Sequence, residues 1–236
     1  MMEDVLNIKN LTKRYNEFCL NSISFTLRAG RILGLLGSNG SGKSTIIKSI
    51  IGLIQPDSGE IEIFGKSLYS DELWIKNKIG YVGDDFFYPE DLTSASLNIL
   101  MGSVYDEWES SKFKTYLERY NVPKKKQIAT FSKGMKMKLS LSVALSHNPD
   151  LIILDEPTEG IDTKDRHEIL RDLEELSKNQ YKSILITTHH ISEMEHIIDD
   201  LVIIEQGNMI VTIGKKELLE SRPDCTLETI YMDLLK

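Results

Sequence analysis

Hydrophobic and polar residues alternate in three early segments of the chain, at 6–11, 19–27 and 59–65. Such alternation is typical of strands that bury one face, as in an antiparallel sheet. A fourth alternating stretch covers 201–214 and is interrupted by the turn-forming residues 206–208, which predicts a β-hairpin. The early segments therefore predict an antiparallel β-subdomain near the N-terminus.

Continuous apolar runs at 32–36, 151–154 and 183–188 instead fit strands that are buried on both faces, as in a parallel sheet. Isoleucines recur at helical spacing over 46–54, and the segment 165–178 has the pattern of an amphipathic helix. Strands that alternate with helices predict an α/β fold with a mostly parallel central sheet.

Between residues 86 and 148 the composition shifts to helix formers, with few strand signals. This block predicts an α-helical subdomain inserted into the α/β core. The end of the chain, 226–236, has the pattern of a short helix.

Composition narrows the function classes. The chain has 236 residues and a formal net charge of −8, and we expect no nucleic-acid partner because no long basic run is present. The two cysteines, Cys19 and Cys225, are far apart, and we expect reduced thiols. The acidic start does not resemble a signal peptide, and no apolar run approaches the ~20 residues of a membrane helix.

The stretch "GSNGSGKST" fits the phosphate-binding pattern G-x-x-x-x-G-K-[ST], between a predicted buried strand and a predicted helix. Glycines let backbone N–H groups point at phosphate oxygens, and the helix adds the positive end of its dipole. Lys43 supplies a charge for the phosphates, and the Ser44 hydroxyl is a candidate ligand of Mg²⁺. The predicted nucleotide-binding residues are Gly37, Ser38, Asn39, Gly40, Ser41, Gly42, Lys43, Ser44 and Thr45. The stretch therefore predicts the phosphate loop of a P-loop NTPase core.

The run "LIILDE" ends in two acids at what should be the ligand edge of the sheet. Asp155 is a candidate for holding the hydration shell of Mg²⁺. Glu156 can orient the water that attacks the γ-phosphate or accept its proton. Up to this point many ATPases and GTPases fit the sequence.

The segment 131–162, from "FSKGM" to "EGID", resembles the signature helix, Walker B strand and D-loop of ABC-transporter ATPase subunits. Ser132 is a good helix N-cap and Gly134 lies in the first turn, which makes a second helix start suited to anions. In the family, this helix binds the γ-phosphate of ATP held by the opposite subunit, which implies contacts from Ser132, Lys133 and Gly134. Lys133 departs from the usual signature, and so does Met135.

The resemblance extends over almost the whole chain and assigns further residues. Tyr15 matches an aromatic that stacks on adenine, Asp162 matches the D-loop aspartate, and His189 matches the switch histidine at the γ-phosphate. His190 is an adjacent alternative to His189. The remaining histidines, His147, His167 and His196, are interpreted as plain surface residues.

The chain reads "GYVGDD" where the family has a glutamine, which puts Asp84 at that position as a candidate magnesium ligand with a shorter side chain. The aromatics Phe86, Phe87 and Tyr88 follow. They either line the groove that receives the membrane subunit in this family, or they pack inside the helical subdomain.

The resemblance implies a single ABC ATPase domain over 1–236, with a nucleotide-binding core at 1–85 and 149–214, a helical subdomain at 86–148 and a tail at 215–236. It implies ATP and Mg²⁺ as cofactors and a second copy, or a related ATPase subunit, as partner. It also implies a separate transmembrane permease and a place on the inner face of the cell membrane. The "SKGM" signature and the tail resemble those of bacterial exporter subunits of the drug-, peptide- or ion-efflux type. A non-transport ABC ATPase and a regulatory nucleotide-binding module remain as alternatives.

Overall fold

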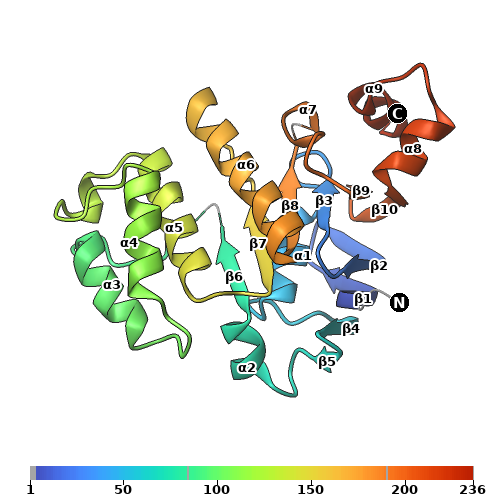
Figure 1. Ribbon diagram of the computed structural model, residues 1–236. Helices are drawn as coiled ribbons and strands as arrows, with labels where there is room; N and C mark the ends of the chain where they lie inside the picture. The colour runs from blue at the N-terminus through green and yellow to red at the C-terminus, as the bar shows by residue number, and fades with distance from the viewer. Residues whose placement is uncertain (1–3, 84, 190, 236) are drawn as a thin grey trace.

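The computed structural model describes residues 4–83, 85–189 and 191–235. Two sheets form its centre (Figure 1). The first has four antiparallel strands in the order β2-β1-β4-β5, with the bounds β1 Asp4–Arg14, β2 Cys19–Arg28, β4 Ser58–Ile63 and β5 Lys66–Ser67. This is the antiparallel subdomain that the alternating pattern predicts.

The second sheet has six strands in the order β10-β9-β3-β8-β7-β6. Five of them run parallel, and β10 pairs with β9 as the predicted antiparallel hairpin. Their bounds are β3 Ile32–Leu36, β6 Ile79–Val82, β7 Leu151–Asp155, β8 Ser183–Thr188, β9 Asp200–Glu205 and β10 Asn208–Gly214.

Nine α-helices lie within the described residues. Their bounds are α1 Lys43–Ile50, α2 Glu72–Asn77, α3 Ser94–Gly102, α4 Ser110–Arg119, α5 Lys133–Ser146, α6 Thr163–Gln180, α7 Ile191–Met194, α8 Lys215–Ser221 and α9 Leu227–Leu234. Helices α3, α4 and α5 gather at one end of the molecule, away from β1 and β2 (Figure 1). The pattern did not predict β5, β6, α2, α7 or α8.

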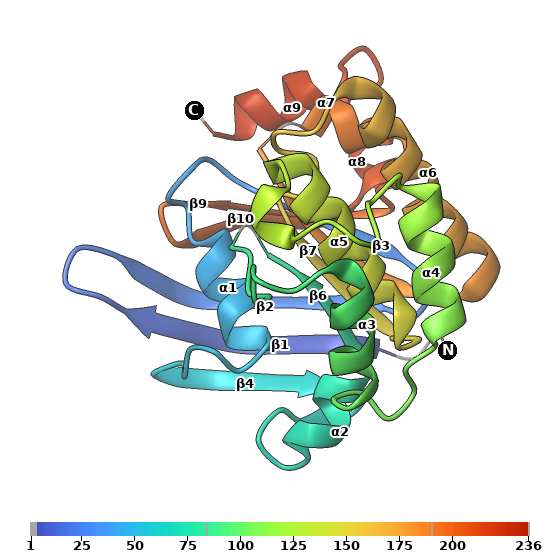
Figure 2. The same cartoon turned by 90° about the vertical axis from the view of Figure 1, so that its left-hand side faces the viewer.

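The six-stranded sheet separates two hydrophobic clusters because its central strands bury both faces. In β7, Leu151 and Ile153 face the cluster shared with β1, β2 and α1, and Ile152 and Leu154 face the cluster shared with α5 and α6. Helix α1 lies close to β1 and β2 (Figure 2), and its isoleucines fill the space between the two sheets. This packing fixes the loop in front of α1 against the carboxyl ends of the parallel strands.

Within the described residues, no helix is both long enough and apolar enough to span a membrane. The fold is the α/β architecture that the sequence predicts.

Candidate functional site

The loop of residues 37–42 connects β3 to α1 and forms one wall of a pocket. Gly42, directly before α1, has a φ angle of 112°, which favours glycine. A Cβ atom at Gly37 would lie only 2.4 Å from both the Ser41 Oγ atom and the Ile204 carbonyl oxygen. The glycines therefore allow the loop to curl tightly beside β9.

The pocket has a volume of about 600 Å³. It is lined by Tyr15, Phe18, Asn39, Gly40, Gly42, Lys43, Ser44, Thr45, Asp155, Glu156, Glu159 and His189. Most of the residues predicted from "GSNGSGKST" therefore border it. Gly37, Ser38 and Ser41 are the predicted loop residues that do not, and they lie on the side that faces β9.

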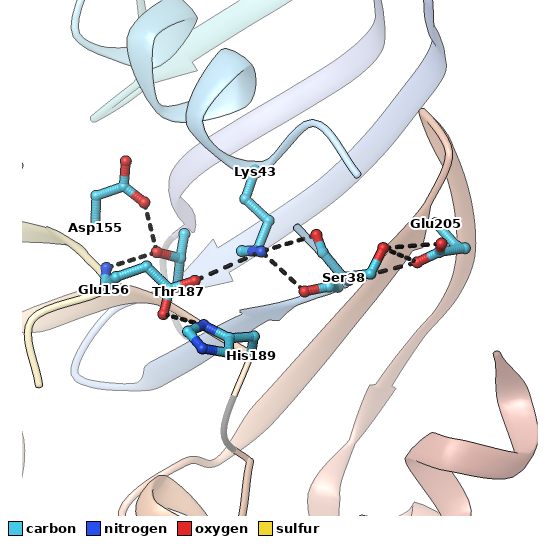
Figure 3. A network of polar contacts seen from close by, with 8 residues as sticks. Ser38, Lys43, Asp155, Glu156, Thr187, His189 and Glu205 are labelled. Atoms are coloured by element: carbon cyan, nitrogen blue, oxygen red, sulfur yellow. Dashed lines mark hydrogen bonds and ion pairs between the residues drawn. The ribbon is translucent and has the colours of Figure 1, made fainter. Parts of the chain in front are cut away.

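Lys43 is buried at the first turn of α1. Its Nζ atom donates hydrogen bonds to the carbonyl oxygens of Gly37 at 2.8 Å and Ser38 at 3.1 Å (Figure 3). It also lies 3.5 Å from Glu156 Oε1. The ammonium group is thus held by the loop and faces the acid at the end of β7.

Glu156 links Lys43 to His189. Its Oε2 atom lies 2.9 Å from His189 Nδ1, and its backbone has a φ angle of 50°, an uncommon value for a residue other than glycine (Figure 3). The structure therefore brings three residues together that lie far apart in the sequence. Together they form a hydrogen-bonded and charged arrangement that can bind a phosphate and orient a water molecule.

Thr187 supports both acids, although sequence reasoning did not select it. Its hydroxyl donates to Asp155 Oδ1 at 2.6 Å and accepts from the Glu156 N–H at 2.9 Å (Figure 3). The residue lies at the end of β8, beside β7 in the parallel sheet. Only this pairing of neighbouring strands reveals its contact with Asp155.

Glu205 is a second residue that sequence reasoning did not select. Its carboxylate accepts from the Ser38 hydroxyl, with both oxygens at 2.8 Å from Ser38 Oγ (Figure 3). It ends β9, next to β3, so it reaches the phosphate loop from the opposite side to Lys43.

Asp155 and Ser44 present the oxygen donors that Mg²⁺ prefers. Both line the pocket, and Ser44 is exposed at the first turn of α1. Within the described residues, no group of three or more His, Cys, Asp or Glu side chains is placed to hold a metal ion. Mg²⁺ usually keeps several waters and is bound through one or two carboxylates together with phosphates. The donor set fits Mg²⁺ bound together with a nucleotide. The third candidate ligand, Asp84, lies outside the described residues.

Tyr15 lies at the rim of the pocket with its side chain 46% exposed. Its ring is 6.3 Å from the ring of Phe18, which also lines the pocket. An exposed aromatic face at the rim is a suitable platform for a purine base.

The signature residues lie outside this pocket. Ser132 caps α5 by accepting a hydrogen bond from the Met135 N–H, as predicted, and it is exposed. Lys133 is also exposed and forms an ion pair of 3.6 Å with Glu159. Among the described residues, the atom closest to a Cβ at Gly134 would be the Gly160 carbonyl oxygen, at 3.7 Å. The start of α5 thus lies at the surface, next to the segment that carries Glu159 and Gly160.

Asp162 caps α6 by accepting hydrogen bonds from the N–H groups of Asp165 and Lys164. The bond from the Asp165 amide is the main reason why the pKa of Asp162 is lowered. His190, the alternative to His189, lies outside the described residues.

The interpretation of His147 as a surface residue is wrong. Its side chain is 1% exposed, stacked on Tyr105 with 4.0 Å between ring centroids, and its Nδ1 atom lies 3.2 Å from the Asn77 carbonyl oxygen. Burial lowers its pKa to about 4. His147 directly follows α5, and it is buried because α5 itself is buried along most of its length. His167 and His196 are exposed.

The three aromatic residues at 86–88 have different environments: two of them pack against the core, and one lines a surface groove. Phe86 and Tyr88 pack against the core cluster and contact each other, with 5.2 Å between ring centroids. Phe87 is 61% exposed and lines an apolar groove of about 430 Å³. Leu53, Leu73, Tyr81, Val104 and Tyr105 are among the other residues of this groove.

Comparisons with known proteins agree with this geometry. Residues 20–159 match the family described as ABC transporter. The chain is 37% identical to the linearmycin resistance ATP-binding protein LnrL of Bacillus subtilis (strain 168), over 92% of this chain and 71% of the relative. It is 34% identical to the Nod factor export ATP-binding protein I of Burkholderia lata, over 96% of this chain and 76% of the relative.

A solved structure of the ATP-binding subunit of an ABC transporter superposes with a TM-score of 0.90 and 28% identity. It covers 98% of this chain and 100% of the solved one. The family that the sequence resembles is therefore confirmed. With this pocket and these relatives, the chain belongs to the ABC transporter family and is an ATPase of that family.

Proposed function

We propose that this chain hydrolyses ATP at the pocket and that Lys43, Glu156 and His189 are the residues that act on the γ-phosphate. The contacts from Lys43 to Glu156 and from Glu156 to His189 carry this proposal. When ATP binds, the ammonium group of Lys43 pairs with a phosphate of ATP in place of the Glu156 carboxylate. Glu156 then orients the attacking water, and His189 senses the γ-phosphate through its ring. Tyr15 stacks on the adenine.

Mg²⁺ belongs to this site by the chemistry of its donors. Ser44 and Asp155 would hold it, and it would supply positive charge to the phosphate oxygens. Thr187 keeps one oxygen of Asp155 occupied, which leaves the other for the metal's hydration shell.

The second element of the proposal is a composite site. The signature residues Ser132, Lys133 and Gly134 present donors and charge but do not border the pocket of their own chain. A second copy, or a related subunit, supplies them. ATP then joins two chains, and hydrolysis releases them. Asp162 lies near this joint, because its loop carries Glu159, which lines the pocket.

The third element is a membrane subunit seated in the apolar groove. Leu53, Leu73, Phe87 and Val104 expose between 57% and 75% of their side chains, an unusual concentration for residues of this size. An amphipathic helix of a permease would bury them. Since the relatives carry names of resistance and export proteins, we assign this chain to an exporter, on the inner face of the cell membrane.

Phosphate release from ATP and Mg²⁺ tests the activity, with Lys43→Ala as the inactive control. Activity of the wild type that exceeds that of Lys43→Ala supports catalysis at this pocket. Equal rates in the two proteins, also in membranes that contain the permease, would leave a regulatory module as the function. For the groove, Phe87→Ser should reduce recovery with the membrane fraction and leave phosphate release by the free chain unchanged.

A further inference from the structure

The end of β9 and the turn that follows it form hydrogen bonds with the phosphate loop at two positions. Glu205, the last residue of β9, accepts from the Ser38 hydroxyl at 2.8 Å and from the Ser38 N–H at 3.4 Å (Figure 3). Gly207 donates its N–H to the Ser41 carbonyl oxygen at 3.0 Å. The loop is therefore attached to this turn through both a side chain and the backbone.

The turn is itself fixed against the antiparallel sheet. The backbone N–H of Asn21 donates to the Gly207 carbonyl oxygen at 2.8 Å, and the side-chain Nδ2 atom of Asn21 donates to Asn208 Oδ1 at 3.1 Å. A Cβ atom at Gly207 would lie 1.8 Å from the Cys19 carbonyl oxygen, so the close approach requires glycine. The turn is thus a rigid support, and Glu205 extends from it.

Ser38 is held from two sides as a result. Its carbonyl oxygen accepts from Lys43 at 3.1 Å, while its hydroxyl and N–H point to Glu205. The N–H of Ser38 is therefore turned away from the pocket. The first residue of the phosphate loop that lines the pocket is Asn39. A loop of glycine and small residues loses much conformational entropy when it binds a ligand, and such bonds reduce that loss by ordering the loop beforehand.

We propose that Glu205 is a positioning residue for nucleotide binding, which acts through Ser38 and does not touch the nucleotide. Glu205 is not among the residues that line the pocket in the described part of the chain. A carboxylate near a phosphate site would by itself repel ATP. If Glu205 mainly orders the loop, its replacement should weaken the binding of ATP. If it mainly repels the phosphates, its replacement should strengthen binding.

The test is titration calorimetry of MgATP with the full chain. Glu205→Ala should raise the Kd for MgATP about tenfold, the effect expected for a lost hydrogen bond to a charged group. Glu205→Gln keeps an oxygen that can accept from the Ser38 hydroxyl, so its Kd should stay within about threefold of the wild type. The value of kcat at saturating ATP should change less than about threefold in both, because the residue does not act on the reacting atoms.

Ser38→Ala should give a similar increase in Kd, and the double variant with Glu205→Ala should bind no more weakly than the weaker single variant. Glu62→Ala is the matched control, since Glu62 forms an exposed ion pair with Lys9 on the other sheet. Thermal melting shows that each variant is folded. A Kd equal to or below that of the wild type in Glu205→Ala would overturn the proposal, and so would additive effects in the double variant. Because the proposal rests on ATP binding at the phosphate loop, a wild type that fails to bind MgATP would instead overturn the proposed function.

Discussion

The Oε1 atom of Glu156 lies 3.5 Å from the Nζ atom of Lys43. The acid that follows β7 and the lysine at the start of α1 therefore form an ion pair. In the proposed mechanism, a phosphate that binds Lys43 takes the place of this carboxylate, which can then orient a water molecule. The two residues consequently have distinguishable effects on binding and on hydrolysis.

Glu156→Gln should lower phosphate release at saturating ATP by roughly 100-fold or more, the usual contribution of general-base catalysis. It should not weaken MgATP binding, because glutamine no longer holds Lys43 by charge. Lys43→Ala should weaken binding itself. Phosphate release and calorimetry, measured on the same preparations, separate the two effects. Equal loss of MgATP binding in both variants would contradict the assignment of Lys43 to binding and Glu156 to hydrolysis.

Thr187→Val should reduce both stability and activity. Valine has nearly the same shape as threonine but leaves the Glu156 N–H and Asp155 without the hydroxyl that they share. We expect a loss of roughly 1–3 kcal/mol in the free energy of unfolding, measured in urea, and about tenfold slower phosphate release. Thr115→Val, on the exposed side of α4, is the control and should change neither. Wild-type turnover in Thr187→Val would show that this hydroxyl does not position the acids.

Tyr15→Ala should raise the Kd for MgATP about tenfold, while Tyr15→Trp should retain affinity, because a larger aromatic face still stacks on adenine. Calorimetry with ATP and with inorganic triphosphate checks the assignment. Only ATP binding should respond, since the triphosphate has no base. An equal response of both ligands would indicate a structural function for Tyr15.

His147 should make stability depend on pH. Its pKa of about 4 in the folded chain lies below the ordinary value of 6.5, so the unfolded chain binds a proton first as the pH falls. The stabilisation is complete above pH 6.5, decreases between about pH 6.5 and pH 4, and changes little below. Relative to His147→Phe, which retains the stack on Tyr105, the wild type should lose about 3 kcal/mol of unfolding free energy between pH 7 and pH 4. Parallel urea curves for the two proteins across this range would show that His147 does not titrate in this way.

Much of the fold follows from local pattern. The double-sided burial of β7 and β8 shows as continuous apolar runs, and the one-sided burial of β1 and β2 shows as alternation. Short elements such as α2 and α7 have too few residues for a helical period to be recognised. The burial of His147 depends on Tyr105 and Asn77, which lie far away in the sequence.

The candidate site divides in the same way. Lys43, Asp155 and Glu156 belong to contiguous motifs whose chemistry is legible from residue type and spacing. Thr187 and Glu205 have no motif of their own, and their contacts arise because the parallel sheet places β8 beside β7 and β9 beside β3. The order of strands in a sheet is a tertiary property. Contacts that depend on it, such as those of Thr187 and Glu205, cannot be predicted from local sequence patterns.

We expect the signature helix of one chain to complete the pocket of another. Two variants test it together with Glu156→Gln, which slows hydrolysis. Gly134→Asp places a negative charge where the partner's phosphate would lie, whereas Gly134→Ala adds only a methyl group to a position whose nearest atom is 3.7 Å away.

The decisive measurement is the mass of the Glu156→Gln chain by light scattering with saturating ATP and Mg²⁺. If ATP joins two chains, the mass should be twice 26.9 kDa. In this background, Gly134→Asp should stay monomeric while it still binds ATP, and Gly134→Ala should form the dimer. A mass of 26.9 kDa for Glu156→Gln at saturating ATP would show that ATP does not join two of these chains.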